Sequence, residues 1–242
     1  MYCFKICVAG IFVSVRARYA LTERICRPYM TDDVRSDLAL FVTTADIEKK
    51  RRSLPIGLDE EQAECICLHE KLALSLLPFD AFVLHAALLE YRGRGYAIVA
   101  PRGVGKSTHA KLWMDTFGKD VRVINGDKPI VRLGKDGRFY AYGTPWCGKE
   151  GWGENAVVPL SAICLLERGE HDAVRALSER EYLEGVIGQV VFPAARSTMS
   201  QSARLLAGMI RRVPAIAAKC TVNEQAARTV CRALVSKGDS NG

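Results

Sequence analysis

Short apolar segments separated by turns, and by stretches with a helical repeat, run through this chain, a pattern typical of an α/β protein. In its first part the pattern predicts strands over residues 4–8, 11–15 and 38–43. The Ala9-Gly10 pair predicts a hairpin turn between the first two strands, and a polar loop is expected near Arg27-Pro28. A charged helix is expected over residues 45–53, followed by a break at Pro55 and Gly57.

Strands and helices alternate through the middle of the chain. Asp59, with Gln62 three residues later, predicts the start of a helix that ends before Pro78. Residues 81–90 read as one continuous apolar strand, joined by a turn at residues 92–95 to the next strand. The further predicted strands cover residues 96–100, 121–125, 129–133, 138–142 and 162–166. Between the first two of these, an apolar helical stripe ends at Gly118.

The last part of the chain is expected to be mostly helical. Capping boxes at Ser178/Glu181 and at Thr221/Glu224 predict two helix starts, with a further helix over residues 202–212 and a strand over residues 215–219. Because hairpins interrupt the strand–helix alternation, we expect an α/β fold in which helices flank a mixed, partly antiparallel sheet. Residues 1–57 are expected to form a small N-terminal lobe with β character, and residues 58–238 the core.

Composition excludes several classes of protein. The hydrophobic fraction of 49% is that of a folded chain, and no apolar run is long enough to span a bilayer, so we expect no membrane partner. The net charge of +7 comes from scattered Lys and Arg residues without interleaved aromatic residues, so a nucleic-acid partner is not expected. The nine cysteines contain no C-x-x-C pair and read as reduced thiols of a cytoplasmic protein.

The strongest chemical signal is a phosphate-binding loop, A-P-R-G-V-G-K-S-T at residues 100–108. Its glycines allow successive backbone N–H groups to face an anion, and the helix that follows adds its N-terminal dipole. In such a loop Lys106 reaches the terminal phosphates of ATP and the Ser107 hydroxyl binds Mg²⁺. Ala100 stands where the consensus has glycine. The residues expected to bind the nucleotide are Arg102, Gly103, Val104, Gly105, Lys106, Ser107 and Thr108.

A second signal is Asp127, which follows the apolar strand predicted over residues 121–125. Nucleotide enzymes place a metal-binding carboxylate at such a position, so Asp127 is expected to hold Mg²⁺ or to accept a proton from the attacking hydroxyl. The alternative is that Asp127 only starts a turn with Gly126. Lys128 either stabilises the transferring phosphoryl group or faces solvent.

Two further features leave alternatives open. His85 lies within an apolar strand, where a histidine is more often a core residue than a site residue. The glycine-rich stretch from residue 143 contains Trp146 and Lys149, and it reads either as a lid or as a structural loop whose tryptophans fill gaps.

Taken in order, H-A-A at residues 85–87, the loop at residues 100–107 and Gly126-Asp127 resemble the HPr kinase and phosphoenolpyruvate carboxykinase superfamily. The chain is most similar to small HPr-kinase-like proteins of bacteria. The resemblance implies a P-loop kinase fold, a functional role for His85, a metal or base role for Asp127, and assembly into a homo-oligomer. Gly126 stands where HPr kinases have the first aspartate of a pair. If that aspartate is the base, either Asp127 performs both roles or Glu150 or Glu154 supplies one.

These residues predict an ATP- and Mg²⁺-dependent kinase that phosphorylates a hydroxyl. The acceptor is expected to be a serine of a peptide or protein, or a small molecule. The catalytic residues would be Asp127, Lys106, His85 and Lys128. Two alternatives remain: a nucleotide-binding regulator or peptide chaperone with little turnover, and a carboxykinase-type small-molecule enzyme.

Overall fold

The computed structural model describes residues 1–54, 57–193 and 195–239, so the break predicted at Pro55 lies outside the described residues. The chain begins with a hairpin of β1 (Tyr2–Val8) and β2 (Ile11–Ala17). Its turn residues Ala9 and Gly10 both have positive φ, 53° and 71°, as a two-residue hairpin turn requires. The predicted hairpin is therefore confirmed. The strand β3 (Leu38–Phe41) pairs with β2 in parallel and completes a three-stranded sheet.

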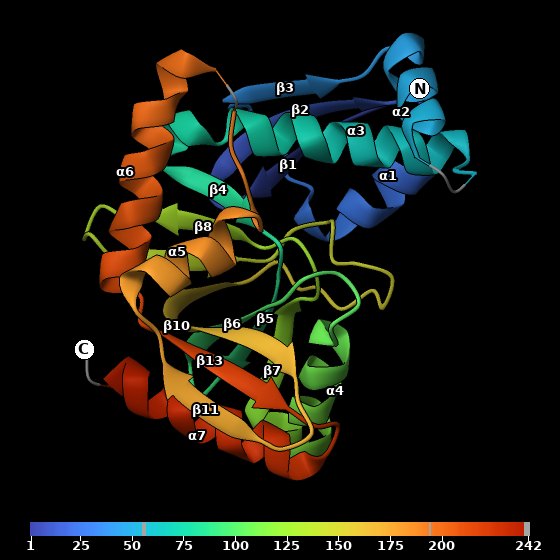
Figure 1. Cartoon of the computed structure of the whole chain (residues 1–242). Coiled ribbons are helices and arrows are strands. Elements are labelled where there is room, and N and C mark those ends of the chain that lie inside the picture. The colour runs from blue at the N-terminus through green and yellow to red at the C-terminus, as the bar shows by residue number, and fades with distance from the viewer. Residues whose placement is uncertain (55–56, 194, 240–242) are drawn as a thin grey trace.

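Helices cover one side of this N-terminal sheet (Figure 1). They are α1 (Ala20–Cys26), α2 (Thr44–Ser53) and α3 (Glu60–Ser75). Capping boxes Thr43/Asp46 and Asp59/Gln62 start α2 and α3, as predicted for α3. Short 3-10 turns follow α1 at Arg27–Tyr29 and α3 at Leu77–Phe79. The loop predicted near Arg27-Pro28 is thus largely helical.

The helix α3 packs mainly with the N-terminal lobe. Its apolar side chains, such as Leu68 and Leu72, share one buried cluster with Ile6 and Val13 of the first hairpin. The same cluster includes Val83 and so continues into the core. The domain boundary after residue 57 stays a prediction.

The apolar run over residues 81–90 is two strands, and its prediction as one strand was wrong. The first, β4 (Ala81–Leu84), pairs with β8 and β12, whereas β5 (Ala86–Tyr91) pairs with β6 and β7. His85 lies between them, and its backbone N–H donates to Gln189 O at 2.7 Å. Both halves are buried, so hydrophobic pattern alone does not reveal the change of partners.

The remaining elements follow the predicted order, with two short strands, β11 and β12, that were not predicted. They are β6 (Arg94–Val99), α4 (Lys106–Phe117), a 3-10 turn (Gly118–Asp120), β7 (Val121–Asn125), β8 (Ile130–Leu133), β9 (Phe139–Tyr142), β10 (Val157–Arg168), β11 (Ala173–Ala176), α5 (Glu179–Ile187), β12 (Val190–Val191), α6 (Arg196–Arg212), β13 (Ala215–Cys220) and α7 (Glu224–Asp239).

One capping prediction was wrong. The side chain at the start of α7 is Asn223, whose Oδ1 accepts the N–H of Ala226 at 2.9 Å. The Thr221 backbone N–H and hydroxyl both donate to Asp172 instead, each at 2.8 Å. The Ser178/Glu181 capping box of α5 is confirmed.

The large sheet is mixed and has the order β12-β4-β8-β9-β10-β6-β5-β7, with β13 beside β10. The long strand β10 pairs with β9 through its first residues and with β6 and β13 through its later ones. Since β5 is antiparallel to both β6 and β7, the strands β7, β6, β10 and β13 all point the same way. Their carboxyl ends therefore share one edge, where open α/β sheets bind ligands.

Helices cover both faces of this part of the sheet (Figure 1). Trp113 of α4 and Leu234 of α7 pack in one cluster with Leu89, while Val186 of α5 and Met209 of α6 pack in another. The expected mixed sheet flanked by helices is confirmed. In the described part of the chain, every helix is too short or too polar to cross a bilayer.

Candidate functional site

The loop that joins β6 to α4 has the backbone shape of an anion-binding loop. Gly103 and Gly105 adopt φ values of +83° and +124°, which side-chain-bearing residues rarely adopt. The helix α4 begins at Lys106, and no side chain caps its first turn, so its first N–H groups face the loop mouth without a side-chain acceptor. Arg168, at the end of β10, donates to Gly103 O at 2.7 Å and Val104 O at 3.0 Å, which turns these carbonyls toward β10.

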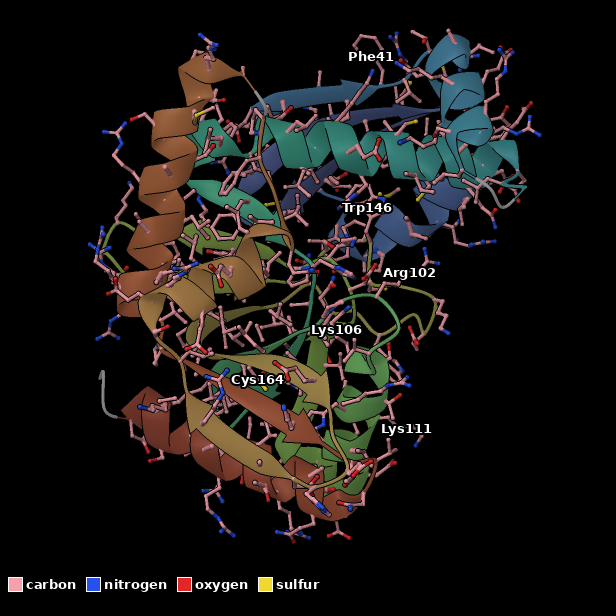
Figure 2. All side chains as sticks on the ribbon, in the orientation of Figure 1. Phe41, Arg102, Lys106, Lys111, Trp146 and Cys164 are labelled. Carbon is pink, nitrogen blue, oxygen red and sulfur yellow. The ribbon has the colours of Figure 1, made fainter. Side chains whose placement is uncertain are left out.

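Lys106 is the charged group at the centre of this loop (Figure 2). Its side chain is buried, with 9% of the residue exposed, and its Nζ donates to Ala100 O at 3.0 Å. Burial lowers the pKa of Lys106, and nearby Asp127 opposes that shift. An ammonium group held in this way, with donors to spare, is suited to an anion. Of the other predicted loop residues, Arg102 and Thr108 are exposed and Ser107 is half-buried.

The structure brings three of the predicted site residues together beside the loop. Asp127 Oδ1 lies 3.0 Å from His85 Nε2 and 3.6 Å from Lys128 Nζ. Burial tends to raise the pKa of Asp127, but the hydrogen bond from His85 and the charge of Lys128 outweigh it, so the pKa is lowered. Burial lowers the pKa of Lys128. An ionised carboxylate thus stands near Lys106, between a histidine and a second lysine.

Two residues that the sequence did not single out hold this group in place. Gln189, next to β12, accepts a hydrogen bond from His85 Nδ1 at its amide oxygen Oε1, 2.8 Å away, so both ring nitrogens of His85 are engaged. Asn125 is fully buried, and its Oδ1 accepts the N–H groups of Asp127 and Lys128 at 2.9 and 2.6 Å. Its Nδ2 donates to Thr144, which ties the site to the glycine-rich loop. Only the position of Asn125, two residues before Asp127, could have indicated it in the sequence.

Gly126 is packed so closely that no side chain fits there. A Cβ at this position would lie 2.7 Å from Cys147 O, and the Gly126 N–H donates to Trp152 O at 2.9 Å. The glycine-rich loop therefore occupies the space in which the resemblance places the first aspartate of a pair. A carboxylate is therefore missing at position 126 both because the residue is glycine and because the glycine-rich loop leaves no room for a side chain.

This packing makes a prediction about stability. Gly126→Ala should lower the free energy of unfolding by about 1–3 kcal/mol, because the backbone atom it meets has to move. Chemical denaturation of the two chains measures the difference. Gly188→Ala is the matched control, since a Cβ there meets nothing within 4 Å, and it should change stability little. Equal stability of Gly126→Ala and wild type would contradict the close packing.

The glycine-rich loop is docked on the N-terminal lobe. Trp146 Nε1 donates to Cys65 O of α3 at 3.1 Å, and its ring centroid lies 5.3 Å from that of His69. Figure 2 shows Trp146 between the N-terminal helices and Lys106 at the start of α4. Of the two interpretations of this segment, the contacts of Trp146 match the structural loop.

The two glutamates considered as alternative bases differ in position. Glu154 forms an ion pair with Arg122 at 2.8 Å, and Arg122 also pairs with Glu90. Glu150 lies near Asp127: its Oε2 is 3.5 Å, and the Asp127 Cγ 3.8 Å, from the point that a Gly148 Cβ would occupy. Glu150 is therefore the better placed of the two to act with Asp127.

Two buried histidines make the fold sensitive to acid. Burial lowers the pKa of His69 to about 4, with the positive charge of Lys128 adding to the effect, and burial lowers the pKa of His109 to about 4 as well. Both values lie below 6.5, the ordinary value for histidine, so the unfolded chain binds more protons between these limits. The stabilisation is complete above pH 6.5 and is lost as the pH falls toward 4.

We therefore expect the free energy of unfolding to fall between pH 6.5 and 4, by up to about 3 kcal/mol for each histidine. Denaturant titrations across this range measure it. His69→Phe should make the pH dependence shallower, whereas the same change at exposed His171 should leave it unaltered. Parallel profiles for wild type and His69→Phe would show that His69 is not buried in its neutral form.

Comparisons with known proteins find weak structural similarity and no sequence match. No protein-family model matches the sequence, and no curated protein matches it. Among solved structures, the HPr(Ser) kinase/phosphatase from Coxiella burnetii is similar over 54% of this chain and 93% of its own chain, at 12% identity and a TM-score of 0.30. At these values the similarity is too weak to argue fold or function from.

Proposed function

We propose that this chain is an ATP-dependent phosphotransferase whose acceptor is a hydroxyl group. The observation that carries the proposal is the convergence of Lys106, Asp127 and His85 at the shared carboxyl edge of β6 and β7. A strand, a glycine loop, an uncapped helix start with a buried lysine, and a carboxylate that follows β7, the parallel strand on the other side of β5, are the parts that phosphoryl transfer uses.

The residues present suit a triphosphate with Mg²⁺. The first-turn N–H groups of α4 and the Lys106 ammonium are donors for phosphate oxygens. The Ser107 hydroxyl and the Asp127 carboxylate are hard oxygen ligands of the kind that Mg²⁺ binds. The metal would neutralise charge on the β- and γ-phosphoryl oxygens.

In the proposed reaction the acceptor oxygen forms a bond to the γ-phosphorus, and the bond from that phosphorus to the bridging oxygen of ADP breaks. Lys106 stabilises the charge that develops on the transferring group and the leaving oxygen. The acceptor's proton moves to a carboxylate, Asp127 or its neighbour Glu150. His85, fixed by Gln189, holds the Asp127 carboxylate in one orientation.

The proposed acceptor is taken from the resemblance of the sequence to HPr kinases. A serine of a peptide or protein is the proposed acceptor, and a small-molecule alcohol is the alternative. The test is calorimetric titration of the full chain with Mg-ATP, followed by transfer of labelled γ-phosphate to serine-containing peptides. Binding with slow phosphate release or transfer supports the proposal. A chain that binds no nucleotide overturns it.

A second candidate, a nucleotide-binding regulator with little turnover, is favoured by one observation. Position 126 has no room for a carboxylate. The site therefore has one acid after β7, whereas the HPr kinases that the sequence resembles have two at this place. Tight ATP binding with no phosphate release and no transfer would favour the regulator.

A further inference from the structure

The order of the strands indicates how a triphosphate bound at the loop would be oriented. This inference rests on the proposed function. Asp127 follows β7, which lies to one side of the phosphate-loop strand β6, whereas β10 and β13 lie to the other side. All four strands end at the same edge. With the γ-phosphoryl end toward Asp127, the nucleoside end leaves the loop toward the ends of β10 and β13.

A cavity opens beside the carboxyl ends of β10 and β13, where the nucleoside end would lie. It has a volume of about 50 Å³ and is formed by the loop between β6 and α4, the first turns of α4, the end of β10, and the end of β13 with the residues that follow it. The lining residues that matter here are Val104, Thr108, His109, Leu112, Arg168 and Thr221. Its far wall is anchored, because Asp172 accepts from both the backbone and the hydroxyl of Thr221.

His109 lines this cavity and carries a buried polar atom without a partner among the described residues. The residue is 2% exposed, and its Nε2 has no hydrogen-bond partner within the described residues. Its backbone N–H donates to Gly105 O at 2.8 Å, which ties the first turn of α4 at His109 to the loop. Buried ring nitrogens are normally hydrogen-bonded, so an unpartnered one beside an anion-binding loop indicates a ligand.

We propose that the nucleobase of the bound triphosphate enters this cavity, with one edge on His109 Nε2 and its face against Leu112. A volume of about 50 Å³ receives the edge of a ring rather than a whole purine, so the rest of the base lies over the cavity mouth beside Val222, which is 75% exposed. Every nucleobase edge carries donors or acceptors, so either tautomer of His109 finds a partner. The guanidinium of Arg168 holds the loop carbonyls and borders the same cavity.

The test separates the base from the phosphates by titrating Mg-ATP and Mg-tripolyphosphate into the same chains. Leu112→Trp fills the cavity and should weaken ATP binding about tenfold or more, while tripolyphosphate binding stays unchanged. His109→Phe keeps the ring volume without the nitrogen and should weaken ATP binding about tenfold. Lys111→Ala is the matched control, because this lysine lies on the outer side of α4 (Figure 2) and pairs only with Asp115 among the described residues.

The outcomes are distinguishable. Selective loss of ATP affinity in both variants, with tripolyphosphate binding intact as proof of folding, supports the inference. A wild-type chain that binds tripolyphosphate as tightly as ATP overturns it and leaves the triphosphate site standing. Unchanged ATP affinity in both variants also overturns it. A wild-type chain that binds neither ligand overturns the proposed function and this inference together.

Discussion

Lys106→Met should abolish nucleotide binding and transfer without unfolding the protein. In the proposed function the ammonium is the charge that meets the terminal phosphates, and a loss of about 10³-fold or more in turnover is expected for such a group. The aliphatic stem packs at the start of α4, and methionine keeps most of that volume.

The same substitution should leave the free energy of unfolding unchanged or raise it, although it removes nucleotide binding. Because burial lowers the pKa of Lys106, holding its charge in place costs free energy in the absence of a ligand. Lys106→Met should therefore unfold at the same denaturant concentration as wild type or a higher one, a pattern found when functional groups are held in unfavourable positions.

Titration calorimetry, phosphate release and chemical denaturation together measure these changes. Lys111→Met, on the outer side of the same helix, is the control for loss of a positive charge, and it should change none of them appreciably. Retention of ATP affinity by Lys106→Met would remove Lys106 from the site. Loss of ATP affinity together with a large loss of stability would show that its role is structural.

Asp127→Asn should retain the fold and nucleotide binding and lose Mg²⁺-dependent turnover by about 10²–10³-fold. The amide has the shape of the carboxylate, and the backbone N–H of residue 127 keeps its bond to Asn125. What is lost is the negative charge that lies near Lys106 and Lys128 and that we propose as a metal ligand.

The informative measurement is turnover against Mg²⁺ concentration, with ATP affinity measured separately. Asp115→Asn, an exposed carboxylate paired with Lys111, is the control and should behave as wild type. If Asp127→Asn turns ATP over as wild type does, the proposed metal and base role is wrong. The regulator would then be the better account of the site.

The sequence predicts turns, helix starts and most strands of this fold well, and it predicts less well which distant residues they pair with. The Ala9-Gly10 turn and the capping box at Asp59 are confirmed because each depends on backbone preferences within a few residues. The division of residues 81–90 at His85 was missed because pairing partners far along the chain decide it. Thr221 was misassigned because its hydroxyl bonds to Asp172, which the sequence does not place beside it.

The same distinction applies to the candidate site. The predicted phosphate-binding loop and Asp127 are visible as motifs, since the chemistry proposed for them requires residues at fixed spacing. Gln189, just before β12, and Arg168, at the end of β10, reach the site only through the folded sheet, because both follow the loop by many residues. No spacing rule connects them to His85 or to Gly103, so their roles needed the three-dimensional arrangement.

The contact between Gly126 and the Cys147 carbonyl also bears on how such a site can change over generations. An aspartate gained at position 126 by a single codon change would meet backbone before it could contribute chemistry. A lineage with this loop would first have to reshape residues 143–153, losing stability before any catalytic advantage appeared. The glycine and the loop are therefore expected to be inherited together, and a homologue with an acid at this position should also carry a different loop.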